Sequence, residues 1–279
     1  MKQPLIIFDI ETAIDREAVY RLTPPWSPAT GKKEHVYWNE IRRKATLNPA
    51  TSTICAIGIH LTGQPPVLLT ETGCGGEAEL LRRFWQIFGE QEDAVFAYWS
   101  GNNGGGCFDP RFLVVRSWVR RVVVPRCAYG PPPGWALSKL KWLDLAPLFL
   151  IGAEKNSRCS ANKAAKTLGL IGQDLGWAVV QDKDELGVTG ASFQEFLADE
   201  CPQTQQEALD YLRNDLALER AIANVLVPAG QSSKVQGPNS KERQKKEGAG
   251  AESAASSSCC LALGTSSHLE LPAREEVVV

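Results

Sequence analysis

An apolar stretch near the N-terminus that contains two carboxylates constrains the fold of this chain most. The segment PLIIFDIET (residues 4–12) is apolar at positions 5–8 and 10, which predicts a strand buried on both faces. Side chains alternate across a strand, so Asp9 and Glu11 point to one face, where burial of two like charges costs stability. A cation between them would reverse that cost, whereas a solvated turn or a helix cap is the alternative interpretation.

Apolar periodicity alternates between strand and helix patterns as far as residue 226. Strands are predicted at 4–11, 53–61, 65–72 and 94–100, and helices at 76–88, 109–121, 160–170, 191–200 and 204–226. Loops are predicted at 13–50, at GNNGGG (101–106) and at 127–135, the first being long enough to contain a small helix of its own. This order predicts an α/β domain with a mixed sheet over residues 1–227.

The composition changes at Pro228. Residues 228–279 lack aromatic residues, have almost no large apolar residue before Leu261 and carry six Lys/Arg and six Asp/Glu, which predicts a disordered low-complexity tail.

Cysteine and histidine usage argues against a zinc site. The chain has 279 residues, of which eight are scattered cysteines without a CxxC pair and only three are histidines. The N-terminus does not resemble a signal peptide, and the apolar runs are too short to span a bilayer. We therefore expect a reducing, cytoplasmic location and no membrane partner.

Charge is divided into blocks along the chain. Residues 110–166 contain eleven Lys/Arg and two Asp/Glu, which gives a net charge of +9. Residues 167–226 contain three Lys/Arg and eleven Asp/Glu, which gives a net charge of −8. A basic middle could bind a polyanion while an acidic site holds metal, although uneven charge also decorates solvated helices. Candidates for phosphate contact are Arg111, Arg116, Arg120 and Arg121, with Trp99 as a base-stacking candidate or a core residue.

A second unusual carboxylate lies on the apolar stripe of the last long helix. The stripe is spaced 4, 3, 4, 3 and comprises Tyr211, Asp215, Leu218, Ile222 and Val225. Asp215 therefore faces the protein in mid-helix and needs a partner. That partner could be metal, or a structural pair with Tyr211, Arg213 or Arg220.

Asp109 follows the glycine-rich loop at the start of a predicted helix, where it could cap the helix or approach a ligand. Together with Asp9, Glu11 and Asp215 it makes four carboxylates from one α/β domain. Such a set favours Mg²⁺ or Mn²⁺ over zinc, and two such ions can hydrolyse a phosphodiester.

Three segments resemble the motifs of one nuclease family. FDIET, GNNGGGCFD and YLRND are similar to the exonuclease motifs of the DEDD 3′–5′ exonucleases, and Tyr-xxx-Asp in the third is the DEDDy form. LNPATSTICAIGI and AAKTLGL also resemble the exonuclease domain of family B DNA polymerases and its stand-alone relatives. The resemblance covers residues 4–226 and implies a ribonuclease H-like fold, a mixed five-stranded sheet flanked by helices.

The resemblance also implies catalytic roles. Asp9 would bridge two divalent cations, Mg²⁺ or Mn²⁺, with Glu11 and Asp215 completing the site of the ion that carries the attacking water. Asp109 would hold the second ion, and Tyr211 would orient the water. The expected reaction releases nucleoside 5′-monophosphates from the 3′ end of single-stranded nucleic acid, with DNA expected before RNA.

Substrate contacts are expected beside the motifs. The candidates are Ile10, Thr12, Asn102, Asn103, Phe108, Arg120 and Arg121. The second motif departs from the family pattern, because four residues separate Asn103 from Phe108 and five separate Asn102 from it, so its loop is lengthened.

Two other interpretations compete with an exonuclease. One is a catalytically inactive ribonuclease H-like module that binds nucleic acid, although a decayed site has no reason to retain Asp9, Glu11, Asp109, Tyr211 and Asp215. The other is a structural interaction domain with ordinary ion pairs. Since the sequence shows no polymerase or helicase domain, a role in proofreading or DNA repair would require a polymerase, helicase or repair partner.

Overall fold

The computed structural model of the chain describes residues 3–101, 108–130, 137–138, 140–154 and 157–227. Its strands are β1 (Leu5–Ile14), β2 (Ser52–His60), β3 (Val67–Thr70), β4 (Val95–Tyr98) and β5 (Trp142–Asp144). Its α-helices are α1 (Arg16–Leu22), α2 (Glu34–Ala45), α3 (Glu71–Cys74), α4 (Glu77–Glu90), α5 (Phe108–Val119), α6 (Ala146–Phe149), α7 (Ala161–Thr167), α8 (Phe193–Leu197) and α9 (Pro202–Leu226). Short 3₁₀ turns are η1 (Pro28–Thr30), η2 (Arg126–Ala128) and η3 (Lys183–Glu185).

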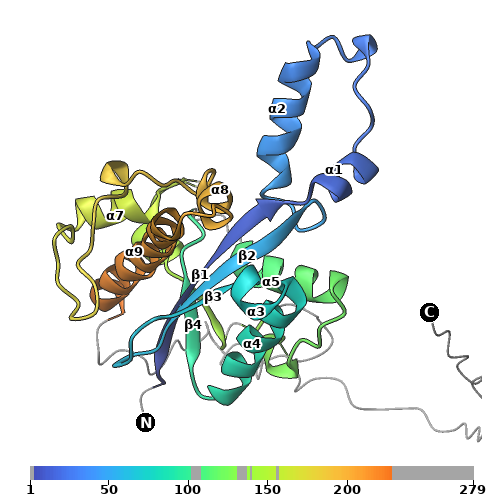
Figure 1. Cartoon of the computed structure of the whole chain (residues 1–279). Coiled ribbons are helices and arrows are strands. Elements are labelled where there is room, and N and C mark those ends of the chain that lie inside the picture. The colour runs from blue at the N-terminus through green and yellow to red at the C-terminus, as the bar shows by residue number, and fades with distance from the viewer. Residues whose placement is uncertain (1–2, 102–107, 131–136, 139, 155–156, 228–279) are drawn as a thin grey trace, which may run out of the picture. The chain divides into compact units, whose positions relative to one another are not determined.

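The five strands form one mixed sheet in the order β3-β2-β1-β4-β5, and Figure 1 labels the first four strands of the chain. β1 pairs antiparallel with β2 and β2 antiparallel with β3, whereas β1, β4 and β5 run parallel. The expectation of a ribonuclease H-like, mixed five-stranded sheet flanked by helices is confirmed. β1 is the central strand, as its apolar run predicted.

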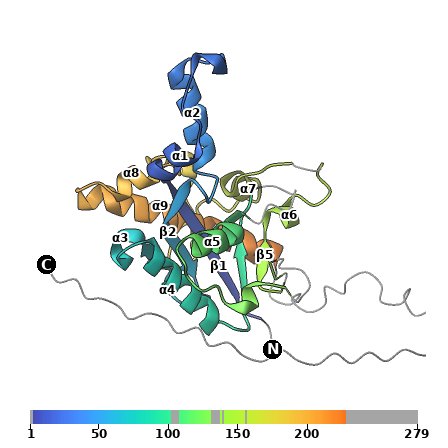
Figure 2. The same cartoon turned by 90° about the vertical axis from the view of Figure 1, so that its right-hand side faces the viewer.

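The two faces of β1 pack against different helices (Figure 2). Ile6, Phe8 and Ile10 belong to a core that includes apolar residues of α4 and α5. Ile7, on the opposite face, packs with Leu216 and other residues of α9. Asp9 and Glu11 share the face of Ile7, so they lie on the side of the sheet that α9 covers.

A glycine on β2 lets α9 approach the sheet closely. Gly58 pairs with Asp9 across the β1–β2 ladder. A Cβ at Gly58 would lie 2.9 Å from Cδ1 of Leu216, on α9. The absence of a side chain at Gly58 therefore allows α9 to lie close to the sheet, and Asp215 is the residue next to that contact.

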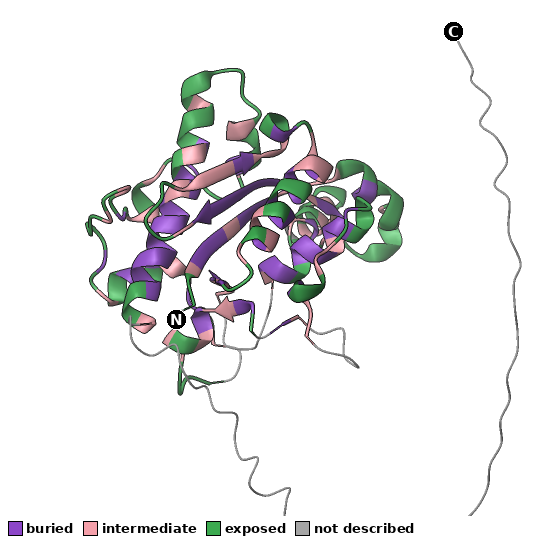
Figure 3. Cartoon of the chain, turned by 90° about the horizontal axis from the view of Figure 1, so that it is seen from below, coloured by how far each residue is buried: buried purple, intermediate pink, exposed green. Residues whose placement is uncertain are grey.

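The sheet core is buried and the outer faces of the helices are exposed (Figure 3). Along α9, Leu218 and Ile222 are fully buried, as the stripe predicted, but Val225 in the last turn is 48% exposed. The apolar stripe thus holds for its first four members and is wrong at the fifth.

Several predicted boundaries differ from the structure. The strand expected at 65–72 ends at Thr70, because the Thr70 hydroxyl accepts a hydrogen bond from Gly73 N and caps α3. The connection expected at 13–50 contains two helices, α1 and α2, and the helix expected at 191–200 is the shorter α8. β5 had no counterpart among the predicted strands.

Parts of three predictions lie outside the described residues. They are most of the GNNGGG loop, residues 131–135 of the loop at 127–135, and the tail at 228–279. Among the described helices, none is both long enough and apolar enough to cross a membrane.

Candidate metal centre

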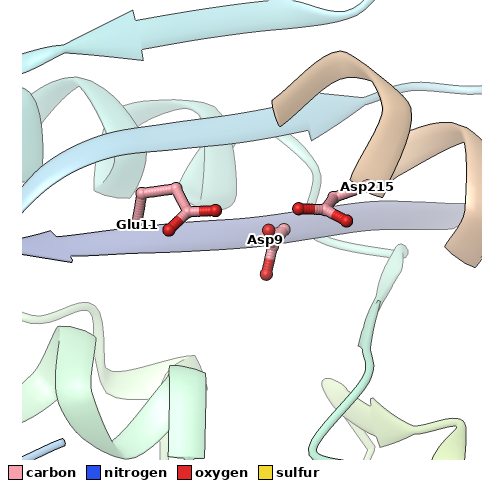
Figure 4. A group of neighbouring side chains, drawn as sticks. All are labelled: Asp9, Glu11 and Asp215. Carbon is pink, nitrogen blue, oxygen red and sulfur yellow. The ribbon is translucent and has the colours of Figure 1, made fainter. Parts of the chain in front are cut away.

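Three carboxylates from two elements converge on one face of the sheet. Asp9 and Glu11 project from β1, Asp215 projects from α9, and each offers a ligand oxygen within 4.8 Å of the others (Figure 4). The strand period of two brings the first pair together, and the close approach of α9 adds the third. The β1–β2 register is interrupted immediately after Glu11, an irregularity of the kind that often lies beside functional sites.

Burial makes the charges on these carboxylates costly. Burial, followed by the charge of Asp215, raises the pKa of Asp9 to about 7. The positive charge of Lys183 lowers this pKa in part. Burial and then the charge of Asp9 hold the pKa of Glu11 well above its usual range. Burial also raises the pKa of Asp215. The three groups therefore destabilise one another in the absence of a compensating cation.

Lys183 contributes one such positive charge, and sequence reasoning did not find it. Its Nζ lies 2.6 Å from Oδ1 of Asp215 and 4.1 Å from the ring centre of Tyr211. Burial tends to lower the pKa of Lys183, but Asp215 and Tyr211 together raise it above its ordinary value. The structural partner of Asp215 is therefore a lysine, whereas Arg213 pairs with Asp210 and Arg220 donates to His60 and to Leu5 O.

Tyr211 lies one helical turn before Asp215, as its spacing predicted, and its side chain is buried. Burial and then the charge of Asp215 raise the pKa of its hydroxyl, which keeps the phenol neutral. A Cβ at Gly190 would lie 3.7 Å from the Tyr211 hydroxyl and 3.8 Å from Oε2 of Glu11. Gly190 thus borders both side chains and contributes no side chain of its own to the space beside them.

Asp109 lies at the start of α5 and is 4% exposed. Burial and then the charge of Asp9 hold its pKa well above the usual range. It is not one of the three residues whose ligand atoms lie within 4.8 Å of one another. Asp109 is therefore subject to the charge of Asp9 but lies outside the group of Asp9, Glu11 and Asp215.

The residues present fit a divalent cation. Carboxylate oxygens are the ligands that Mg²⁺ and Mn²⁺ prefer, and the three close carboxylates carry more negative charge than the ammonium of Lys183 offsets. A bound cation would relieve the repulsion that burial intensifies. The Asp/Glu group can therefore hold a metal ion.

A basic, partly aromatic cavity adjoins the start of α5. It has a volume of about 940 Å³ and is lined by Phe108, Arg111, Arg158 and Lys163 among others. The lining includes three cationic side chains and no acidic one among the described residues. Sequence reasoning named Phe108 and Arg111 but missed Arg158 and Lys163, which come to the cavity from a separate part of the chain.

The other residues expected to contact substrate are buried, paired with other residues, exposed or outside the described residues. Ile10 is buried in the core, and Thr12 donates its hydroxyl to Thr46 O. Arg120 pairs with buried Glu77, and Arg121 is exposed with a φ of 55°. Asn102 and Asn103 lie outside the described residues.

Like Arg120, the phosphate candidate Arg116 and the stacking candidate Trp99 have structural partners. Arg116 is buried and donates to both carboxylate oxygens of Glu77. Trp99 is half-buried, donates its Nε1–H to Cys159 O and packs against Phe149. These contacts favour the core interpretation of Trp99 and account for the charge of Arg116 inside the protein.

Comparison with known proteins supports the fold assignment. No protein-family model and no curated protein matches the sequence. The solved structure of the family B DNA polymerase from the hyperthermophilic archaeon Pyrobaculum calidifontis is similar, with a TM-score of 0.54 and 14% identity. The match covers 82% of this chain and 25% of the polymerase chain, so the chain spans about a quarter of that protein.

Proposed function

We propose that this chain is a metal-dependent 3′–5′ exonuclease that hydrolyses the terminal phosphodiester bond of single-stranded nucleic acid, DNA before RNA. The observation that carries the proposal is the convergence of Asp9, Glu11 and Asp215 in one largely buried group. The similarity to a quarter of a family B DNA polymerase is consistent with the exonuclease domain of such an enzyme.

Asp9, Glu11 and Asp215 would hold a divalent cation, and Asp109, whose pKa is raised by the charge of Asp9, would contribute to a second. Bound Mg²⁺ or Mn²⁺ supplies Lewis acidity for the phosphoryl group and a nucleophilic water at neutral pH. The protein contributes the fixed positions of its carboxylates, two from a central strand and one from a long packed helix. Rigid elements of this kind hold ligand atoms in place more accurately than loops do.

Tyr211 and Lys183 place two hydrogen-bond donors beside Asp215. The raised pKa of the Tyr211 hydroxyl keeps its proton in place, so the phenol orients a water or a phosphate oxygen and does not act as a base. The ammonium of Lys183 offsets negative charge next to Asp215 and can stabilise charge that develops on the phosphate.

The basic cavity beside Phe108 suits the strand that leads away from the scissile bond. Arg111, Arg158 and Lys163 can contact phosphates, and Phe108 offers an aromatic ring to a base. Single-stranded nucleic acids bind to this combination of charge and stacking with little sequence preference. A polymerase, helicase or repair protein would be the source of the 3′ end in a cell.

A degradation assay tests the proposal. Single-stranded DNA and RNA labelled at the 5′ end are incubated with the protein in Mg²⁺, Mn²⁺ or EDTA. We expect a ladder of shortened products with either ion and none in EDTA. Binding without a ladder would favour the inactive nucleic-acid-binding module, and neither binding nor a thermal shift with Mn²⁺ would favour a structural interaction domain.

Matched variants separate the site from a contaminating nuclease. Asp9→Ala and Asp215→Ala should abolish the ladder, because each removes a carboxylate of the close group. Asp210→Ala, which removes an exposed aspartate from the same helix as Asp215, should retain the wild-type rate. A ladder of equal intensity from all three variants would refute the assignment.

A further inference from the structure

Glu219 is a buried carboxylate on α9 that neither the sequence motifs nor the close group accounts for. It lies four residues, about one helical turn, after Asp215, so both side chains project from the same side of the helix. Its side chain is 3% exposed. A glutamate is seldom buried to this extent unless it is paired or ligates a cation.

One oxygen of Glu219 lacks a partner. Oε2 is buried and, within the part of the chain that the structure describes, accepts no hydrogen bond. The adjacent Arg220 does not fill this role, since its guanidinium donates to His60 and to Leu5 O. An unpartnered buried oxygen of this kind requires an explanation, and an ion is one of the few available.

Glu77 shows how this fold buries a glutamate that has a structural role. It is also 3% exposed, but it accepts hydrogen bonds from Ile54 N and from the guanidinium groups of Arg116 and Arg120. Four donors thus reach its two oxygens. Glu219 has no comparable set among the described residues, so a structural ion pair does not explain it.

The charges that act on Glu219 are those of the candidate metal centre. The pKa of Glu219 is held well above its usual range, first by burial and then by the charges of Asp9, Asp109 and Asp215. The positive charge of Lys183 lowers this pKa in part. Asp9 is also the first charge that acts on Asp109. Glu219 is therefore subject to the charges of the same acidic residues, although it is not one of the three whose ligand atoms lie within 4.8 Å of one another.

We propose that Glu219 is an additional ligand of the metal centre and holds a second divalent cation together with Asp9 and Asp109. The proposal rests on the proposed function, since it presumes that Asp9, Glu11 and Asp215 hold the first cation. It assigns a partner to the unpartnered Oε2 and explains why a further acidic residue is buried beside a site already crowded with carboxylates. Oxygen ligands from three carboxylates suit Mn²⁺ or Mg²⁺.

Mn²⁺ binding to the full chain, measured by electron paramagnetic resonance and calorimetry without nucleic acid, tests the assignment. The wild type should bind two ions. Glu219→Gln should retain the first ion and bind the second about 10- to 100-fold more weakly. Glu219→Asp should recover part of the loss, and Glu207→Gln, an exposed change on the same helix, should match the wild type.

The melting temperature of Glu219→Gln in EDTA shows whether Glu219 is a metal ligand or a structural residue. Since glutamine removes a charge from a crowded acidic group, Glu219→Gln should melt at the same or a higher temperature than the wild type without metal. If Glu219→Gln binds two ions with unchanged affinity, or melts at a lower temperature than the wild type in EDTA, Glu219 is not a ligand. Either result would leave the proposed function standing. A wild type that binds no Mn²⁺ would overturn both this role and the proposed function.

Discussion

At the residue scale, the candidate centre balances three close carboxylates against the ammonium of Lys183. Lys183 contacts Asp215 at 2.6 Å and lies over the ring of Tyr211. This lysine stabilises the acidic group partly, and the residual repulsion is what a divalent cation would relieve. Local instability of this kind is common where a protein keeps a ligand site preorganised.

Replacement of Tyr211 by phenylalanine tests the role of its hydroxyl. The change keeps the ring over which Lys183 lies but removes the donor beside Asp215. If the hydroxyl orients the nucleophile, the single-turnover rate should fall by about 10- to 1000-fold with substrate affinity nearly unchanged. A loss of about 1 kcal/mol of unfolding free energy with normal turnover would instead assign Tyr211 a structural role.

The convergence of Asp9, Glu11 and Asp215 could be predicted because it follows from the side-chain periods of one strand and one helix. The strand period places Asp9 and Glu11 on one face, and the helix period places Asp215 on the stripe that packs against the sheet. Lys183 could not be predicted, since it lies in a polar stretch without periodicity and reaches Asp215 only through the tertiary fold.

At the scale of elements, a buried ion pair ties α4 and α5 to β2. Glu77 on α4 accepts from Arg116 on α5 and from Ile54 N on β2. The block of basic residues suggested that Arg116 contacts phosphate. Its charge instead pairs with Glu77 inside the protein. Charge blocks in a sequence do not distinguish solvated arginines from buried ones, because burial depends on which elements pack together.

Replacement of Glu77 by alanine should destabilise the protein by about 3–5 kcal/mol, because it leaves Arg116 buried without its counter-charge. Urea unfolding followed by circular dichroism measures the loss. Glu79→Ala, which removes a half-buried partner of exposed Arg82 on the same helix, should cost less than about 1 kcal/mol. Equal losses for the two variants would show that the Glu77 pair does not link the elements.

The basic cavity makes a prediction for strand binding. Replacing Arg158 and Lys163 together by alanine should weaken binding of a single-stranded oligonucleotide in EDTA, because both line the cavity. The slope of log K against log salt should flatten by about 1.4, or about 0.7 for each phosphate that is no longer neutralised. Fluorescence anisotropy at several salt concentrations measures both quantities.

The control for this prediction is the pair Arg82→Ala and Arg83→Ala on α4, which removes two charges outside the lining of the cavity. This pair should leave the slope near that of the wild type. An unchanged slope after replacement of Arg158 and Lys163 would place the strand elsewhere on the protein.

β5 shows where pattern reasoning fails at this scale. It comprises only Trp142–Asp144 and pairs in parallel with β4 at the end of the sheet. Three residues are too few to establish an alternation, and the pairing is a non-local contact that no local pattern encodes. The connection 13–50 was expected to contain a small helix, but the bounds of α1 and α2 were not predicted, because their apolar residues do not form a long periodic stripe.

At the scale of the whole molecule, the order of strands and helices was enough to predict the fold class. An antiparallel hairpin followed by parallel strands and intervening helices gives the mixed sheet that the structure contains. Predicted helices and strands were displaced by a few residues at their ends without changing this order. Boundaries depend on capping contacts such as that of Thr70, whereas the order depends on burial over whole elements.

Removal of residues 228–279 should leave the domain intact. α9 ends with Val227 N donating to Ala223 O, and the residues beyond it are poor in large apolar side chains. The truncated chain should match the full chain in melting temperature and in its rate on short oligonucleotides. A marked fall in melting temperature would show that the tail packs against the domain.

The most direct test of metal-dependent cleavage from the 3′ end is the fate of a label on the 3′-terminal nucleotide of a single strand. In a single turnover with Mn²⁺, we expect the label to leave first as a nucleoside 5′-monophosphate, and EDTA or Asp9→Ala to prevent its release. Retention of the label on the strand, or its release as an oligonucleotide or a 3′-monophosphate, would be incompatible with a metal-dependent 3′–5′ exonuclease.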